Sequence, residues 1–222
     1  MLKLQKNCFG FLLHKTEQQR QCEEEEHKCH YVALESLLVK HPLKNTWTMW
    51  YYKVKSSNVW MECHTEIASF NTVEDFWAVY HHLNLPSEIE RGSGYSMFRK
   101  GIKPMWEDSH NWNGGRWLFT IQESNDCQKL DDIWMEMLIL LIGEAFGDNN
   151  EQVCGCVVSV WRKFDKIGIW TADASKKENI LEIGKICKIA LKESYNESVN
   201  WMYRSHSAQR KYGVQFSTLY TL

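Results

Sequence analysis

The chain has 222 residues, a formal net charge of -2 and a hydrophobic content of 44%, which is typical of a globular protein with one main domain. A net charge so close to zero provides no general attraction to nucleic acid, so any nucleotide site must be a local cluster of basic residues. No apolar run is long enough to span a membrane as a helix.

Residues 1–40 are predicted to form a disordered tail ahead of a folded domain at residues 41–222. The tail is rich in charged residues, including the glutamate run at 23–26, and it has no sustained hydrophobic periodicity. A short helix around residues 31–39 is an alternative for the end of this tail. Residues 8–13 are apolar but too short for the core of a secretion signal, so we expect a cytoplasmic or nuclear protein.

Two cysteines and two histidines lie close together in this tail, but their spacing matches no standard zinc pairing; they are Cys22, His27, Cys29 and His30. We therefore expect no metal site and no other cofactor. Several other cysteines fall inside periodic segments, where small buried apolar residues are expected rather than disulfides. These are Cys63, Cys154, Cys156 and Cys187.

Aromatic and β-branched residues at 45–54 predict a strand, and residues 60–70 predict a second strand. Thr72 and Asp75 have the spacing of a helix-capping box, so a helix is predicted from this point to about Leu83. The folded part of the chain is therefore expected to begin with a hairpin that leads into a helix.

Residues 130–146 predict a longer helix, because apolar residues recur with the spacing of one helix face. That face comprises Leu130, Ile133, Trp134, Met137, Leu138, Leu141, Ile142, Ala145 and Phe146. A third helix is predicted at 177–192. Further strands are predicted at residues 95–99, 117–122, 153–164, 167–172 and 201–206. Strands outnumber helices and come in hairpin-like pairs, so we predict an α+β fold in which helices cover one face of an antiparallel sheet.

The chain contains 11 tryptophans, and two of them lie in segments where burial is not expected. Trp60 ends a polar turn, and Trp106 lies on a loop directly before Glu107. An exposed indole on a loop usually has something to stack on, and basic residues follow downstream. This combination suggests a flat, cationic, phosphorylated ligand. Four other tryptophans lie in periodic segments and are predicted to be core residues: Trp47, Trp50, Trp117 and Trp134.

Several strings agree in order and spacing with one known family. They are His41-Pro42-Leu43, Thr72-Val73-Glu74-Asp75-Phe76-Trp77, Pro104-Met105-Trp106-Glu107-Asp108, Gly114-Gly115-Arg116-Trp117, Leu141-Ile142-Gly143-Glu144-Ala145-Phe146, Val153-Cys154-Gly155 and Lys166-Ile167-Gly168-Ile169-Trp170-Thr171. From about residue 41 to the C-terminus, the chain resembles the 4E family of mRNA cap-binding translation initiation factors, as a divergent paralogue. The resemblance implies a curved antiparallel sheet of about eight strands, with three helices on its convex face and a cap-binding groove on its concave face.

The resemblance also implies which residues bind the 7-methylguanosine triphosphate cap of mRNA. Methylation at N7 makes the base cationic, so the base gains stacking and cation–π attraction between two indoles. By resemblance, Trp60 and Trp106 are these two indoles, and Glu107 accepts two hydrogen bonds from the base edge. Trp170 would lie beside the N7 methyl group. The residues that would contact the triphosphate are Arg116, Lys163 and Lys166.

A second surface is indicated by apolar residues outside the core face of the helix at 130–146. Met135 and Ile139 lie one turn apart and flank Glu136, an arrangement that suggests a surface for a partner helix. By resemblance, this surface binds a helix of a 4G-type scaffold protein and of 4E-binding repressor proteins. The resemblance adds to it His41, Pro42, Leu43, Val73 and Trp77. An ordinary core position is the alternative for Trp77.

The main departure from the family pattern is Trp161, where family members usually carry an arginine. Since side chains alternate along a strand, Trp161 should face the groove and Arg162 should point away from it. The groove is therefore expected to lack one cation that the family places on the triphosphate.

We predict a protein that binds the mRNA cap and recruits a scaffold protein to start translation initiation. The alternative is a cap-binding translational repressor that competes with the main initiation factor. An enzyme that hydrolyses the cap would need a general base or a metal-binding cluster of carboxylates. The sequence shows no acidic cluster of that kind, so no catalysis is expected.

Overall fold

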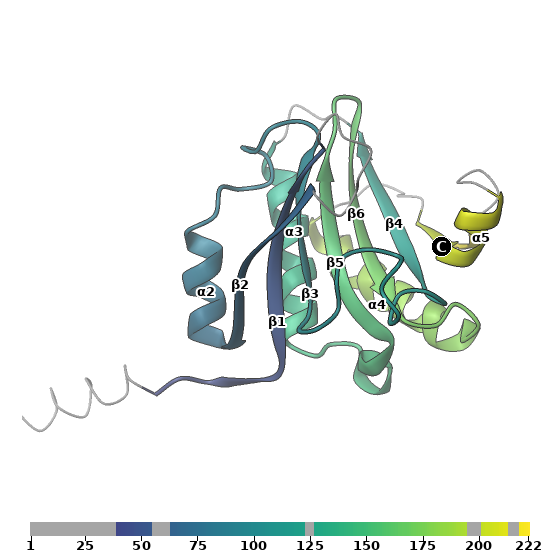
Figure 1. Cartoon of the computed structure of the whole chain (residues 1–222), viewed down its shortest axis with the longest axis horizontal. Helices are drawn as coiled ribbons and strands as arrows, with labels where there is room; N and C mark the ends of the chain where they lie inside the picture. Colours follow the sequence, from purple (N-terminus) through teal and green to yellow (C-terminus); the bar gives the residue numbers. More distant parts are fainter. Residues whose placement is uncertain (1–38, 55–62, 123–126, 195–200, 213–217) are drawn as a thin grey trace, which may run out of the picture. The chain divides into compact units, whose positions relative to one another are not determined.

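An antiparallel sheet forms the centre of the fold, and in the described part of the chain it has eight strands in the order β2-β1-β3-β5-β6-β4-β7-β8 (Figure 1). The strands are β1 (Pro42–Lys53), β2 (His64–Thr72), β3 (Ser93–Arg99), β4 (Gly115–Gln122), β5 (Val153–Val160), β6 (Phe164–Thr171), β7 (Met202–Ser205) and β8 (Thr218–Thr221). The helices are α2 (Val73–His81), α3 (Cys127–Ile142), α4 (Lys177–Ser194) and α5 (His206–Tyr212), with a short 3-10 helix η2 (Gly147–Gln152). The curved sheet with helices on its convex face confirms the predicted fold class.

The computed structural model describes residues 39–54, 63–122, 127–194, 201–212 and 218–222. The chain divides into two units, Met1–His41 and Pro42–Leu222, and every element named above belongs to the second unit. The predicted tail and the alternative helix at its end lie almost entirely outside the described residues, so both stay predictions. Within the described ranges, no helix is long and apolar enough to cross a membrane.

Side chains alternate along each strand, so every strand contributes to a helix-covered face and to an open face. The helix-covered face packs against α3 and α4 around the main apolar core, where Trp47, Trp117 and Trp134 are 1%, 0% and 2% exposed. These confirm three of the four tryptophans predicted as core. Trp50 is a correction: it is partly exposed and pairs with Ser96 on the open face. Its odd spacing from Trp47 places it on the other side of the strand.

The predicted helices are present, although their ends differ from the predictions. Thr72 caps α2 as expected, and its hydroxyl accepts a hydrogen bond from the backbone N–H of Asp75 at 3.2 Å. The helix predicted at residues 130–146 ends earlier than expected, because α3 stops at Ile142 and Glu144, with a φ of 53°, turns the chain out of the helix. Phe146 nevertheless stays buried, which explains why it continued the apolar pattern.

Three short elements, η2, α5 and β8, and one turn were not predicted from the sequence. The strand predicted at 153–164 is in fact β5 and the start of β6, because the chain turns at residues 161–163. The elements η2, α5 and β8 were missed because segments of this length contain too few residues to show a period.

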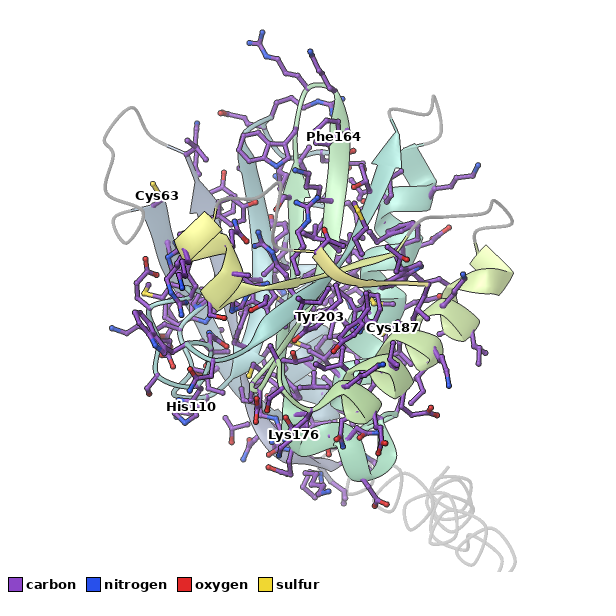
Figure 2. The ribbon with its side chains drawn as sticks, turned by 90° about the vertical axis from the view of Figure 1, so that its right-hand side faces the viewer. Cys63, His110, Phe164, Lys176, Cys187 and Tyr203 are labelled. Carbon is purple, nitrogen blue, oxygen red and sulfur yellow. The ribbon has the colours of Figure 1, made fainter. Side chains whose placement is uncertain are left out.

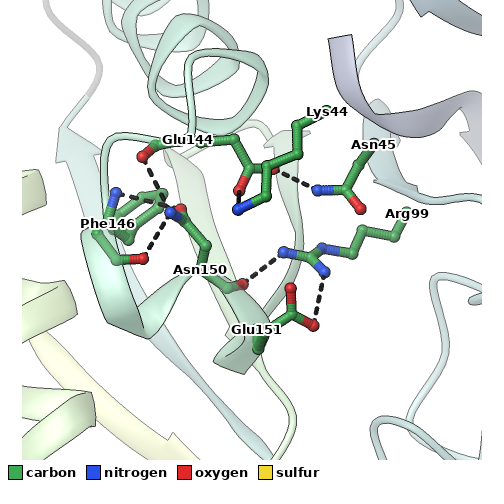
Figure 3. Close-up of polar contacts among 8 residues, drawn as sticks. Lys44, Asn45, Arg99, Glu144, Phe146, Asn150 and Glu151 are labelled. Carbon is green, nitrogen blue, oxygen red and sulfur yellow. Dashed lines mark hydrogen bonds and ion pairs between the residues drawn. The ribbon is translucent and has the colours of Figure 1, made fainter.

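A polar network joins the beginning of β1 to the turn after α3 (Figure 3). The Nζ atom of Lys44 lies 3.4 Å from the carboxylate of Glu144, and the side-chain amide of Asn45 donates to the same carboxylate. Asn150 donates to the backbone carbonyl of Glu144 at 3.0 Å, and its own backbone carbonyl accepts from Arg99 at 2.6 Å. These bonds fix the first residues of β1 against the end of α3.

Candidate functional site

A groove of about 190 Å³ lies on the open face of the sheet, away from the core that α3 and α4 cover. Its lining includes Arg116, Trp161, Lys166, Trp170 and Arg204 from the strands and the turn of the sheet, and Pro104 from the loop before β4. Trp161 lines the groove beside the β5–β6 hairpin; Figure 2 labels Phe164 at this hairpin and His110 in the loop before β4. The groove therefore runs from that loop towards the hairpin.

Two arginines face each other across the floor of this groove. Arg116 on β4 pairs with Arg204 on β7 in the strand register, so their side chains project from directly opposed positions. Opposed like charges are unfavourable, and burial followed by repulsion from Arg204 lowers the pKa of Arg116 to about 10. The Nε atoms of both arginines are buried and have no hydrogen-bond partner among the described residues. This pair is suited to binding an anion.

Lys166 adds a third cation to the same region. It pairs with Ser159 across the β5–β6 hairpin, and its Nζ atom lies 4.7 Å from the centroid of the Phe164 ring. Burial, followed by repulsion from Arg116 and Arg204, lowers the pKa of Lys166. No carboxylate in the described ranges forms an ion pair with any of the three. We call Arg116, Lys166 and Arg204 the cation cluster.

Trp170 forms the apolar part of the groove floor beside the cation cluster. The guanidinium carbon of Arg116 lies 5.4 Å from the centroid of the Trp170 ring. The indole is 5% exposed, it packs edge-on against Phe98, and its centroid lies 4.4 Å from that of His206. Trp170 can therefore offer a ligand an apolar edge, but neither face of its ring is open for stacking.

The loop before β4 presents an indole and a carboxylate side by side. Trp106 is partly exposed and packs against a small apolar cluster that includes Phe98 and Trp170. Its indole N–H donates to the exposed carboxylate of Glu107. The cluster thus connects this loop to the groove floor, and an acceptor for a base edge lies directly beside a stacking ring.

A buried asparagine holds this loop in place, and sequence reasoning missed it. The side-chain amide of Asn111 donates to the backbone carbonyls of Lys103 and Met105, both at 2.9 Å. The backbone carbonyl of Asn111 accepts a hydrogen bond from Nδ1 of His206 at 2.9 Å, so the first residue of α5 is bonded to the loop. The carboxylate of Asp108 accepts the backbone N–H of Lys103 at 3.0 Å. These bonds preorganise the indole and the carboxylate.

Burial of His206 predicts that the stability of the fold depends on pH. Burial lowers the pKa of His206 to about 3, whereas an unfolded histidine has a pKa near 6.5. A histidine with a lowered pKa stabilises the fold above the unfolded value, and this contribution decreases as the pH falls from about 6.5 towards about 3. Between about pH 7.5 and 5, we expect the free energy of unfolding to decrease by about 2 kcal/mol more in the native protein than in His206→Asn.

The measurement is urea denaturation at the two pH values. Asparagine keeps a donor for the backbone carbonyl of Asn111 but does not titrate. Equal pH dependence in the two proteins would show that His206 is not held neutral by burial.

The structure brings some of the predicted ligand residues together and leaves others apart. Arg116, Lys166 and Trp170 line the groove, and Trp106 with Glu107 lies at its loop end. Lys163 is exposed at the β5–β6 hairpin and does not line the groove. Trp60 lies outside the described residues, so its role stays a prediction. Trp161 lines the groove and Arg162 does not, as predicted, but strand alternation is not the reason, because residues 161–163 form a turn.

Arg204 is the groove residue that sequence reasoning missed. It becomes visible only when β7 is placed beside β4, because nothing near Arg204 in the sequence marks it as a partner of Arg116. In the described part of the chain, no cluster of acidic, cysteine or histidine side chains could hold a metal ion.

The predicted partner surface lies on α2, α3 and the start of β1. Trp77 is partly buried: it packs edge-on against Phe76 and Tyr80 and stacks on His81. On α3, Ile139 is 41% exposed, and Met135 and Glu136 are partly buried.

The first residues of β1 lie beside the start of α2. Pro42 pairs with Thr72 in the strand register, which places Pro42 and Leu43 close to Val73, the first residue of α2. Pro42 is exposed and Leu43 and Val73 are partly buried. His41 is exposed and belongs to the first unit of the chain, so its placement relative to this surface stays a prediction.

Comparisons with known proteins agree on one family. The family described as Eukaryotic initiation factor 4E matches residues 42–218. The chain is 45% identical to Eukaryotic translation initiation factor 4E1 of Drosophila melanogaster over 83% of this chain and 70% of that protein. The structure is similar to Ascaris suum eIF4E-3 in complex with an m2,2,7G cap, with a TM-score of 0.76, 41% identity and coverage of 83% of this chain and 99% of that one. It is also similar to C. elegans eIF4E-3 in complex with the 4E-binding protein Mextli and a cap analog, with a TM-score of 0.75, 37% identity and coverage of 83% and 100%.

Proposed function

The chain belongs to the eukaryotic initiation factor 4E family, and we propose that its groove binds the 7-methylguanosine cap of mRNA. A second surface, on α2 and α3, binds a helix of a 4G-type scaffold protein or of a 4E-binding repressor. The protein then connects a capped mRNA to the proteins that start or block translation initiation. We expect no catalytic step.

The observation that carries this proposal is the cation cluster, which lies on the same face as a partly exposed indole and an exposed carboxylate. A methylated guanine is a flat cation, and it requires a stacking ring and an anionic acceptor for its edge. Trp106 and Glu107 provide both at the loop end of the groove. Trp60 is the second stacking ring that the sequence predicts.

The same geometry supports a site for the triphosphate of the cap. The cation cluster begins next to Trp170 and extends to Lys166, roughly 13 Å further along β6 at about 3.3 Å per residue. Its charges are not neutralised by carboxylates among the described residues, and its partly desolvated arginines make strong charge-assisted hydrogen bonds to phosphate oxygens. With its base at the loop end, the cap therefore directs its phosphates towards the β5–β6 hairpin.

The direct test is a titration with 7-methylguanosine triphosphate and with unmethylated guanosine triphosphate, followed by tryptophan fluorescence. Only the methylated base carries a positive charge, and a desolvated cation–π contact contributes about 2 kcal/mol. We therefore expect roughly thirtyfold preference for the methylated ligand. Equal affinity for the two nucleotides would refute the proposal.

Trp161 should lower the affinity of the groove for the triphosphate. It lines the groove at the hairpin end, where an arginine would add a charge-assisted hydrogen bond of about 1.5–3 kcal/mol. We expect Trp161→Arg to tighten binding of 7-methylguanosine triphosphate roughly tenfold or more and to leave binding of the 7-methylguanosine nucleoside nearly unchanged. The native protein should correspondingly bind the cap more weakly than a relative that carries this arginine.

Competition titrations with the two ligands measure this contrast. If Trp161→Arg does not change affinity for the triphosphate, then Arg204 or another cation already neutralises the phosphates that an arginine at this position would reach.

The partner surface has the features of a helix-binding site. Val73 and Trp77 lie one turn apart on α2, and Met135 and Ile139 lie one turn apart on α3. The hydrogen bonds from Ser87 to the carboxylate of Asp131, at 2.9 and 2.6 Å, tie the loop after α2 to the first part of α3. The two helices therefore present a fixed apolar surface, which a partner helix recognises through residues spaced by three and four positions.

A further inference from the structure

The β5–β6 hairpin carries two exposed aromatic side chains surrounded by cations. Trp161 and Phe164 are 36% and 37% exposed, and they line a hollow of about 580 Å³ together with Arg91, Arg162, Lys163 and Lys166. We call these six residues the hairpin platform. Single exposed apolar side chains are common, but neighbouring ones that share a hollow can mark a surface for a ligand or partner. Aromatic rings among cations are typical of surfaces that bind single-stranded nucleic acid.

Hydrogen bonds and an ion pair hold the backbone of the turn in the hairpin platform. The guanidinium of Arg91 donates to the backbone carbonyl of Trp161 at 2.6 Å and lies 3.6 Å from the carboxylate of Asp165. The same carboxylate accepts the backbone N–H of Trp161 at 2.9 Å. The turn is thus bonded to Arg91 from the loop before β3 and to Asp165 on β6, which lowers the entropy lost when a ligand binds.

The charge of the hairpin platform favours an anionic ligand. Asp165 neutralises Arg91, but no carboxylate in the described ranges forms an ion pair with Arg162, Lys163 or Lys166. These three cations can contact the phosphates of a nucleic acid strand. The two exposed rings beside them can stack on its bases.

The hairpin platform is also continuous with the cap groove. Trp161 and Lys166 line both hollows. In the proposed orientation of the cap, the triphosphate points from the loop end towards this hairpin, so the nucleotides that follow the triphosphate leave the groove at the hairpin platform.

Resting on the proposed cap binding, we propose that the hairpin platform binds the first nucleotides of the mRNA after the cap. Phe164 stacks on a base, and Arg162 and Lys163 contact the backbone phosphates. The protein then recognises capped RNA by the cap and by the adjoining single strand, without reading a particular base sequence.

The experiment compares 7-methylguanosine triphosphate with a capped pentanucleotide RNA. In the native protein we expect the capped RNA to bind roughly tenfold more tightly, which lies within the contribution of one stacked base. Phe164→Leu keeps an apolar contact but removes stacking. In this variant we expect the gain from the RNA to fall to twofold or less, while affinity for 7-methylguanosine triphosphate changes far less, because Phe164 does not line the cap groove and Lys166 keeps its charge.

Ile189→Ala is the matched control, because Ile189 is an apolar side chain on α4 that is 70% exposed; this variant should keep the full gain. The inference is overturned if the native protein binds the capped RNA no more tightly than 7-methylguanosine triphosphate. It is also overturned if the tighter binding of the capped RNA persists in Phe164→Leu and in the double variant Phe164→Leu with Arg162→Ser. It is also overturned if Phe164→Leu weakens both ligands equally, since the ring would then belong to the cap site. Failure of the native protein to bind 7-methylguanosine triphosphate would instead refute the proposed function.

Discussion

Trp106→Ala should weaken binding of 7-methylguanosine triphosphate by roughly a hundredfold or more without unfolding the protein. The indole combines base stacking, which contributes about 1–3 kcal/mol, with a cation–π contact of about 2 kcal/mol. It also positions the carboxylate of Glu107, to which its N–H donates. Because Trp106 is only partly buried, the thermal midpoint should change little. Fluorescence titration and a thermal melt measure the two quantities.

Trp112→Ala is the matched control for this experiment. Trp112 belongs to the same loop and is 47% exposed, but its ring packs on the guanidinium of Arg210 at 3.8 Å rather than on the groove. We expect it to change cap affinity by no more than a few-fold. A similar loss in both variants would mean that the loop as a whole, rather than the Trp106 ring, governs affinity.

Trp77→Ala should remove binding of a 4G-type scaffold peptide and leave cap binding intact. Truncation of a central interface tryptophan commonly costs about 2 kcal/mol or more, or roughly thirtyfold in affinity. Cap affinity should be unchanged, because α2 packs against the helix-covered side of the sheet and the groove lies on the other. Titration with the peptide and with 7-methylguanosine triphosphate measures the two effects separately.

Trp77 also contacts the buried ring of Phe76, so a second variant is needed to separate a partner-binding role from a core role. Ile139 is 41% exposed on α3, and Ile139→Glu should weaken peptide binding with little loss of stability. If Trp77→Ala lowers the thermal midpoint and cap affinity together, and Ile139→Glu has no effect on the peptide, then this is not the partner surface.

Periodicity predicted most of the fold because the apolar residues occur on long elements. The face of α3 that includes Leu130, Ile133 and Leu138 was correct, since helix packing requires that spacing. The end of the helix was wrong, because Phe146 remains buried after the chain has left the helix. The apolar periodicity indicates which side chains are buried, but it does not indicate the backbone conformation at those residues.

The candidate site was predicted only where its residues lie in distinctive strings. Arg204 and His206 were missed because their roles depend on β7 and α5, which lie beside β4 and the loop before it only in the folded chain. Asn111 was missed for a similar reason: a buried amide that bonds to backbone carbonyls cannot be told in sequence from an exposed loop asparagine. The placement of such residues depends on contacts between distant segments.

The opposed arginines on β4 and β7 also affect the protein when no cap is bound. Arg116 and Arg204 repel each other across the sheet, and a triphosphate bound as proposed would convert this repulsion into attraction on both sides. The empty protein should therefore be less stable than its packing alone would make it, and inorganic triphosphate should stabilise it even though it lacks the base. A tighter groove and a more stable empty protein then place opposite demands on these two positions.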